Sequence, residues 1–224
     1  MTRTYWVAGA AVVLAVLFAV GATVATANGP DGGRGGSAAA APALHSPDAG
    51  FARDMAVHHQ QAVEMSFIVR DRTQDEAVRA LAYDIANTQA NQRGMLLGWL
   101  DLWGLPKVVA DEPPMSWMAS AQGHGGSAGH GGHAAAKPGA LMPGMATKEE
   151  LGKLGAAGGR DAEVLYLQLM TDHHKGGVAM AEGCARQCGT PAEKALAQGM
   201  VEAQQSELTL MADMLRGRGA APRG

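Results

Sequence analysis

The sequence predicts an all-α fold: a four-helix bundle made of two repeated helical hairpins, preceded by an N-terminal signal or anchor helix. Residues that favour helices dominate the chain, and β-branched residues are scarce beyond its N-terminus. Apolar residues recur at helical spacing over long stretches. The pattern Met-x-x-His-His-x5-Met occurs at 55–65 and again at 170–180, and the repeat holds at a constant offset of 115 residues. Two copies of one hairpin, joined by an insertion, are typical of a four-helix bundle.

Residues 1–27 have the layout of an export or anchoring segment. Arg3 is the only charge before Asp31, and an apolar run from Tyr5 to Val20 leads to small residues that end at Ala27. We interpret this segment as a secretory signal peptide. An uncleaved anchor helix is the alternative, because the apolar stretch is long enough to span a bilayer. Either way, the rest of the chain is expected outside the cytoplasm, secreted or anchored to the outer face of the cytoplasmic membrane.

The helical domain is expected at 46–216. Ser46 at the N-cap, Pro47 at the first helical position and Asp48 in the first turn are typical of a helix start. Capping boxes are predicted at Thr147–Glu150 and, after a Gly-Thr-Pro stop and restart signal, at Thr190–Glu193. The long helices are expected at about 46–72, 75–104, 161–187 and 191–216.

Three other segments lack a helical pattern. Residues 28–45 are rich in Gly and Ala and predict a flexible tether. Residues 104–146 are rich in Gly, His and Met, and we expect a mobile insertion there. Residues 217–224 predict a disordered tail.

The repeated pattern places four donor side chains on one face of each helix. At about 100° per residue, the two methionines and two histidines of a copy fall within an arc of about 120°. Methionine on such a face is usually core packing. Paired imidazoles, however, carry polar nitrogen atoms that need partners, so their occurrence twice favours metal binding over core packing. The predicted ligands are Met55, His58, His59, Met65, Met170, His173, His174 and Met180.

Ligand softness indicates the metal. Thioether and imidazole together suit Cu(I), and by the same argument Ag(I). Zinc sites rarely use Met, and di-iron bundles need inward carboxylates, whereas Glu64 is matched by Ala179 in the second copy. Copper is therefore the expected ion, with silver as a second. Because the unperturbed imidazole pKa is about 6.5, Cu(I) affinity is expected to fall on acidification.

Further polar and sulfur-bearing residues are candidates for supporting roles. Polar residues on the core-like faces of the second and fourth long helices either orient the histidines or lie at a bundle edge: Gln89, Gln92, Gln204 and Glu207. Donors in the insertion either wrap a metal ion or belong to a spacer: Met142, Met145, His124, His130 and His133. Cys184 and Cys188 are either thiolate ligands or a disulfide, although a pair four apart inside a regular helix fits disulfide geometry poorly.

The doubled Met-x-x-His-His-x5-Met signature and the element MPGMAT-x-E-E-L resemble the domain of unknown function 305 family, over about residues 46–216. The resemblance implies a ferritin-like fold and, for extracytoplasmic members, binding of copper or silver and copper resistance. It assigns the eight repeated Met and His residues to the family signature, with Met142 and Met145 in the MPGM element. The chain departs from the family at Gly176 and Gly177, which predict a kink in the third long helix.

Composition excludes several functions. The net charge of −3 offers no broad basic surface for nucleic acid, and no residue pattern indicates hydrolysis or phosphoryl transfer, so no catalytic residue is assigned. We expect a non-enzymatic protein that sequesters Cu(I) or transfers it to another copper-handling protein, in contact with a membrane only through an uncleaved N-terminus. The alternatives are a metal-dependent oxidoreductase and a structural or partner-binding bundle in which Met and His are packing.

Overall fold

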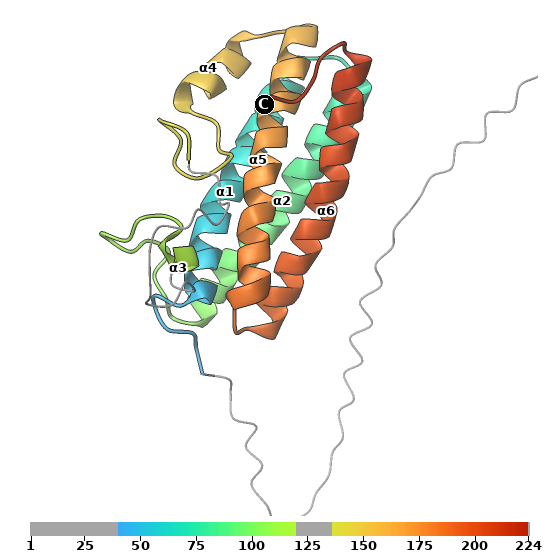
Figure 1. Cartoon of the computed structure of the whole chain (residues 1–224). Helices are drawn as coiled ribbons and strands as arrows, with labels where there is room; N and C mark the ends of the chain where they lie inside the picture. The colour runs from blue at the N-terminus through green and yellow to red at the C-terminus, as the bar shows by residue number, and fades with distance from the viewer. Residues whose placement is uncertain (1–39, 120–135, 224) are drawn as a thin grey trace, which may run out of the picture. The chain divides into compact units, whose positions relative to one another are not determined.

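Two helical hairpins form the body of the protein (Figure 1). The computed structural model describes residues 40–119 and 136–223. The predicted signal or anchor segment, most of the tether, and His124, His130 and His133 lie outside the described residues. The described ranges contain α-helices and no strand, which confirms the predicted all-α bundle of repeated hairpins. The ferritin-like relationship that the resemblance implied stays a prediction.

The long helices are α1 (Pro47–Arg70), α2 (Glu76–Leu102), α5 (Gly159–Gln187) and α6 (Pro191–Gly217), and the short ones are α3 (Ser116–Ala119) and α4 (Lys148–Ala156). Each hairpin packs on itself, α1 on α2 and α5 on α6, and the hairpins meet mainly through α1 and α5. These two helices run antiparallel (Figure 1). No helix of the described residues is long and apolar enough to cross a membrane.

The predicted helix starts are largely present. The Ser46 side chain accepts from the Ala49 N–H, and the capping box at Thr147–Glu150 is complete. The capping box predicted at Thr190–Glu193 is wrong, because the Thr190 side chain makes no capping bond and Glu193 is buried inside the bundle. Asp48 of α1 takes that place: its carboxylate accepts from the Gly189 and Thr190 N–H groups at 2.7–3.0 Å.

The described parts of the insertion make specific contacts with the bundle, and its mobility stays a prediction. The Trp117 side chain is buried, its ring packs edge-on against Phe51 at 5.8 Å, and its Nε1–H donates to Asp54. A Cβ at Gly50 would lie 2.6 Å from Trp117, so the glycine permits this contact. Apolar side chains that a Gly-rich composition obscured anchor both ends of the insertion to the bundle, including Met118, Met142 and Met145.

The C-terminal tail also differs from its expectation. The Ala221 carbonyl accepts from the Gln168 side chain, and Arg223 pairs with Glu150 at 2.7 Å. Burial acts to raise the pKa of Glu150, but hydrogen bonds from Lys137, the Thr147 N–H and Arg223 lower it to about 2. Residues 217–223 are therefore held against α4 and α5 by specific polar contacts.

The two glycines of α5 do not interrupt it, since the helix is continuous from Gly159 to Gln187. A Cβ at Gly176 would overlap the Pro143 carbonyl oxygen, and a Cβ at Gly177 would lie 2.5 Å from the Gln204 Oε1. The predicted kink is absent because these positions serve close approach rather than bending. Gly176 allows the chain at Pro143 to lie directly on the α5 backbone.

Candidate metal centre

The histidines of the two repeats meet where α1 crosses α5. The rings of His58 and His173 stack with centroids 3.8 Å apart and planes inclined by 33°. The His173 Nε2–H donates to the His58 carbonyl at 2.9 Å. His58, His59, His173 and His174 are all fully buried.

The outer histidine of each pair donates to a polar residue of the neighbouring helix. The Nε2–H of His59 donates to Gln92 Oε1 at 2.9 Å, and the Nε2–H of His174 donates to the Glu207 carboxylate at 2.7 Å. In each pair the histidine and its partner are 33 residues apart in sequence, so the arrangement is repeated in the two halves. Of the two alternatives left open for Gln92 and Glu207, these contacts correspond to the one in which the residues orient the histidines. An acceptor on Nε2 fixes the tautomer and leaves the lone pair on Nδ1.

The other two predicted supporting residues do not bond to the histidines. Gln89 is buried and neither end of its amide has a hydrogen-bond partner among the described residues. Gln204 is buried beside Gly177, and its Oε1 is likewise without a donor.

Burial keeps the imidazoles of His58, His59 and His173 neutral. Burial lowers the pKa of His58 to about 3, with the nearby Pro143 carbonyl opposing the shift, and it lowers the pKa of His59 to about 3 with help from the His58 charge. It also lowers the pKa of His173 well below the ordinary value. Neutral imidazole is the form that binds a metal ion.

Buried nitrogen atoms without partners make this centre suitable for a metal ion. The Nδ1 atoms of His59, His173 and His174 are buried and have no hydrogen-bond partner among the described residues. Leaving a buried polar atom unpaired costs about 1–3 kcal/mol, and a bound cation removes that cost. A set of unpaired imidazole nitrogens therefore fits a metal ion that accepts nitrogen ligands.

The imidazoles are close but do not converge on one point. Within the described residues, the only group of three or more His, Cys, Asp or Glu donor atoms lying within 4.8 Å of one another is Cys184, Cys188 and Glu193. The stacked His58 and His173 rings face each other rather than a common centre. Rotation of these side chains is needed to bring several nitrogen atoms onto one ion.

The methionines of one repeat do not gather at one place. Met55 and Met180 belong to one buried hydrophobic cluster, whereas Met65 and Met170 belong to another. Because α1 and α5 are antiparallel, each cluster takes one methionine from each repeat. All four side chains are fully buried, and the histidines lie between the clusters along α1 and α5. Their role as ligands stays a prediction, and any ligand set must combine both repeats.

A segment of the insertion, residues 142–146, covers the crossing of α1 and α5. The Gln61 amide holds Ala146 by two bonds, accepting from its N–H at 2.7 Å and donating to its carbonyl at 2.9 Å. Gly144 adopts a left-handed φ of 78° where a Cβ would overlap the Asp172 carbonyl oxygen. No role was predicted for Gln61 and only a kink for Gly176, although the two residues occupy the same repeat position, 115 residues apart.

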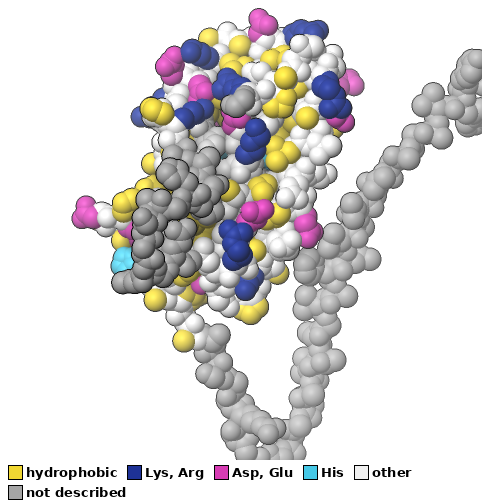
Figure 2. Space-filling view, viewed as in Figure 1, with side chains coloured by type: hydrophobic (Ala, Val, Ile, Leu, Met, Phe, Trp, Pro, Cys, Tyr) yellow, Lys and Arg dark blue, Asp and Glu magenta, His cyan; other side chains and the backbone are white. Residues whose placement is uncertain are grey.

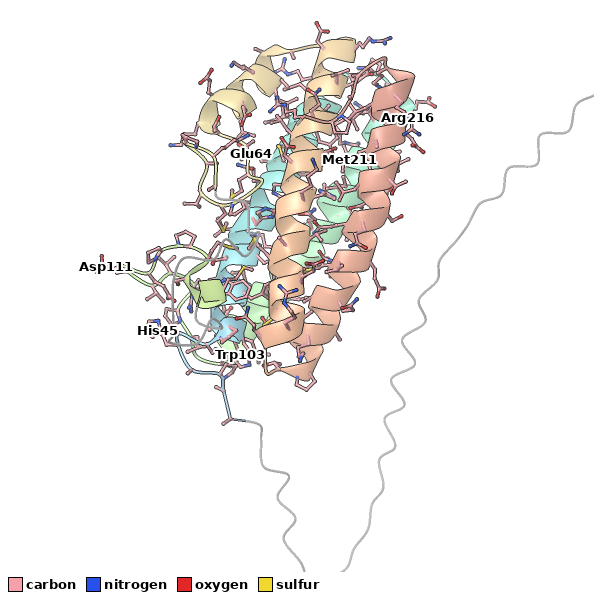
Figure 3. All side chains as sticks on the ribbon, viewed as in Figure 1. His45, Glu64, Trp103, Asp111, Met211 and Arg216 are labelled. Carbon is pink, nitrogen blue, oxygen red and sulfur yellow. A yellow bond between two sulfur atoms is a disulfide. The ribbon has the colours of Figure 1, made fainter. Side chains whose placement is uncertain are left out.

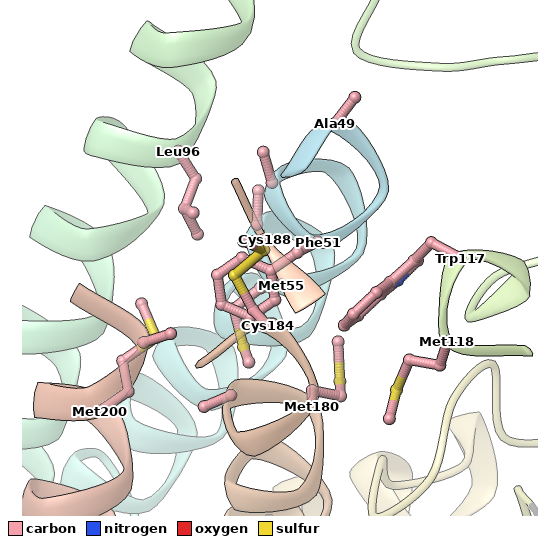
Figure 4. Close-up of a cluster of buried hydrophobic side chains, with 14 of the residues drawn as sticks. Ala49, Phe51, Met55, Leu96, Trp117, Met118, Met180, Cys184, Cys188 and Met200 are labelled. Atoms are coloured by element: carbon pink, nitrogen blue, oxygen red, sulfur yellow. A yellow bond between two sulfur atoms is a disulfide. The ribbon is translucent and has the colours of Figure 1, made fainter. Parts of the chain in front are cut away.

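Cys184 and Cys188 form a disulfide, which contradicts a thiolate role for them in this oxidised state. Two cysteines four residues apart fit disulfide geometry poorly only inside a regular helix. Cys188 lies outside the helix, as the C-cap of α5 with an extended backbone (φ −61°, ψ 143°). Figure 4 shows the pair among the side chains of Met55, Met180 and Met200.

Glu193, which the sequence predicted to complete a capping box, is instead buried beside Asp48. Burial and the Asp48 carboxylate raise its pKa to about 9, so Glu193 is protonated at neutral pH and can donate to Asp48. Burial acts to raise the pKa of Asp48, but the Gly189 and Thr190 N–H groups lower it. Glu64 is exposed on α1 (Figure 3), and Figure 2 shows charges of both signs interspersed on the face in view.

The family model described as "Domain of unknown function (DUF305)" matches residues 48–215. The chain therefore belongs to the DUF305 family, as its doubled signature predicted. No curated protein matches the chain in a sequence comparison.

Solved structures share the fold. A DUF305 protein from Streptomyces coelicolor is 60% identical to this chain, and its name proposes that it is secreted. The match covers 81% of this chain and 99% of that chain, with a TM-score of 0.71. A DUF305 fragment from Deinococcus radiodurans is 26% identical, with 77% and 97% covered and a TM-score of 0.59. CopM in its Cu(I)-bound form is 18% identical, with 76% and 96% covered and a TM-score of 0.56.

Proposed function

We propose that this protein binds Cu(I), and Ag(I) in the same way, outside the cytoplasm, and that it sequesters the ion or passes it to another copper-handling protein. One observation carries the proposal. Three buried imidazoles, His59, His173 and His174, hold their N–H groups on fixed acceptors and leave their Nδ1 lone pairs without a partner. An apolar core needs no such arrangement, whereas a metal site does.

The surroundings favour a soft monovalent ion. Burial holds the His59 and His173 imidazoles neutral, and the repeated methionines of α1 and α5 are buried thioethers, which carry no charge. A neutral donor set stabilises a monovalent cation with little electrostatic help and suits Cu(I) better than a hard divalent ion. CopM, which shares the fold, has been crystallised in Cu(I)-bound, Cu(II)-bound and silver-bound forms.

An extracytoplasmic location is part of the proposal. The Streptomyces coelicolor relative has a name that proposes secretion, and the N-terminal residues of this chain predict a signal or anchor. The disulfide at the C-terminal end of α5 also suits an oxidising compartment.

Competition titration with a Cu(I) chelator tests the proposal. Replacing His59 and His174 by Phe should lower Cu(I) affinity at least tenfold, because each loses an Nδ1 donor, and second-sphere changes alone cost about tenfold or more. The matched control is His45→Ala, since His45 is exposed and lies outside the centre. Equal affinity in the double variant and the wild type would leave the histidines as core packing. Far-UV circular dichroism verifies that the double variant is folded.

A further inference from the structure

The end of the bundle at Cys184 and Cys188 is built like a second donor site, separate from the histidine centre. Both sulfur atoms and a Glu193 carboxylate oxygen lie within 4.8 Å of one another. Cys184 and Glu193 are fully buried, and Cys188 is 3% exposed. No other group of this kind is found among the described residues.

Glu193 has no function in the fold that explains its position. No N–H or O–H group of the described residues donates to either of its oxygen atoms. Its one close polar neighbour is Asp48, itself a carboxylate. Glu193 can donate its proton to Asp48, but its two oxygen atoms, buried beside the sulfur atoms, accept no hydrogen bond, which is costly unless another state of the site provides a donor.

The disulfide contributes little to holding the turn that contains it. It joins residues only four apart in sequence, so it removes little entropy from the unfolded chain compared with a bond across a long loop. Asp48 holds the same turn independently, through the N–H groups of Gly189 and Thr190. The arrangement of Cys184, Cys188 and Glu193 is therefore set by α1 as well as by the disulfide.

We propose that the Cys184–Cys188 pair is a redox-gated metal site: the disulfide form is closed, and the dithiol form binds one Cu(I) ion through both sulfur atoms beside the Glu193 carboxyl. Thiolates are the softest ligands that proteins offer and favour Cu(I). The thioethers of Met55, Met180 and Met200 share the surrounding cluster (Figure 4) and provide further soft donors.

The opening step needs a two-electron reductant of the dithiol class. One thiolate of the reductant attacks a sulfur atom of the pair, the S–S bond breaks, and the reductant closes into its own disulfide. Its two protons pass to Cys184 and Cys188. Cu(I) then binds as the two thiol protons are released. The oxygen atoms of Glu193 then gain neighbouring S–H donors or a metal ion, which they lack in the disulfide form.

The test compares the aerobically purified protein with the same protein treated with a dithiol and desalted without oxygen. Cu(I) is titrated against a competing chelator. The reduced protein should bind one Cu(I) equivalent more than the oxidised protein, with the ultraviolet absorption of Cu(I)–thiolate bonds. An equal stoichiometry in both states overturns the proposal, as does an extra equivalent of Zn(II) with no extra Cu(I).

Two variants locate the extra equivalent. The double substitution Cys184→Ala and Cys188→Ala should abolish the gain on reduction, and a gain that survives in it overturns the proposal. Glu193→Gln should lower the affinity of the reduced protein for the extra Cu(I) ion by about tenfold and leave Cu(I) binding by the oxidised protein unchanged. An unchanged affinity for the extra ion would show that Glu193 does not belong to the site. The wild-type comparison stands even if a variant fails to fold. Because the oxidised protein reports the histidine centre alone, failure of that centre and failure of this site are read separately.

Discussion

His174 donates its Nε2–H to the Glu207 carboxylate at 2.7 Å, whereas His59, at the same place in the first repeat, donates to the neutral Gln92 amide at 2.9 Å. A carboxylate withdraws the ring proton more strongly than an amide does, and it makes the opposite nitrogen a stronger donor. The two halves of the centre are therefore alike in geometry and unlike in basicity.

The first prediction follows from this difference. Glu207→Gln makes the second half match the first and should weaken Cu(I) binding by about tenfold, measured by chelator competition. Glu202→Gln is the control, since Glu202 is an exposed acid of the same helix. A loss of affinity as large in the control would show that the overall charge of α6 matters rather than the contact with His174.

A second prediction concerns the contact between α5 and residues 142–146. Gly176→Ala places a methyl group onto the Pro143 carbonyl oxygen and should lower the free energy of unfolding by about 1–3 kcal/mol, measured by urea denaturation. The control is Gly199→Ala on α6, where no atom lies within 4 Å of the new methyl group. That control should gain about 0.5–1 kcal/mol from helix propensity. Stabilisation by both substitutions would contradict the close approach.

The third prediction concerns the two bonds that hold residues 142–146. Gln61→Met keeps the size of the side chain but leaves the Ala146 N–H and carbonyl unpaired. It should lower the free energy of unfolding by about 1–3 kcal/mol and speed the exchange of bound Cu(I). Gln60→Met tests the same change at an exposed neighbour. Metal exchange at an unchanged rate would mean that the ion reaches the histidines by another path.

The fourth prediction concerns the stability of the metal-free protein in acid. His58 and His59 have folded-state pKa values lowered to about 3, whereas histidines in the unfolded chain titrate near the ordinary imidazole pKa of about 6.5. Below about pH 6.5 the unfolded state binds protons that the folded state does not. The stability contributed by each neutral histidine is therefore full above that pH and is lost progressively as pH falls toward about 3. Urea unfolding should show a loss of up to about 2 kcal/mol per buried histidine between about pH 6.5 and pH 5. His45→Ala should leave this slope unchanged, and a flat profile in the wild type would contradict burial of the neutral rings.

The fifth prediction corrects the expected fall of Cu(I) affinity on acidification, which was based on the unperturbed imidazole pKa. Unperturbed imidazoles would lose Cu(I) as pH falls through about 6.5. In the folded protein, burial of His58 and His59 moves proton uptake to about pH 3. Cu(I) affinity should thus change by less than about threefold between about pH 7.5 and pH 5, measured with a pH-corrected competitor. A tenfold fall over that range would show that solvent protons reach the centre.

Much of the fold could be predicted from the sequence because its signals are local. Ser46 and Thr147 cap the helices that they were expected to cap, and the hydrogen-bonding roles of Gln92 and Glu207 follow from helical spacing and the repeat. The antiparallel crossing of α1 and α5 is not local. It places the two methionines of each repeat in different hydrophobic clusters. The angular positions of residues around a single helix cannot show this division.

Other features could not be predicted because they depend on contacts between distant segments. Glu193 has the spacing of a capping box, yet Asp48, far away in sequence, occupies the turn and turns Glu193 inward. The glycines of α5 have low helix propensity, yet they are required by the approach of Pro143 and Gln204 rather than by a bend. Sequence spacing alone carries no information on either neighbour.

Gln61 and Gly176 occupy the same position of the two repeats and hold opposite ends of one five-residue segment, Gln61 at Ala146 and Gly176 at Pro143. The repeats are thus related by a pseudo-twofold axis that passes close to the stacked His58 and His173 rings. A true homodimer of one hairpin would present the same residue on both sides of such an axis. A fused chain, unlike such a homodimer, can place an amide on one side and a bare backbone on the other. Fusion therefore permits a single strap to lie asymmetrically across a nearly symmetric centre, and it permits one half of that centre to be more basic than the other.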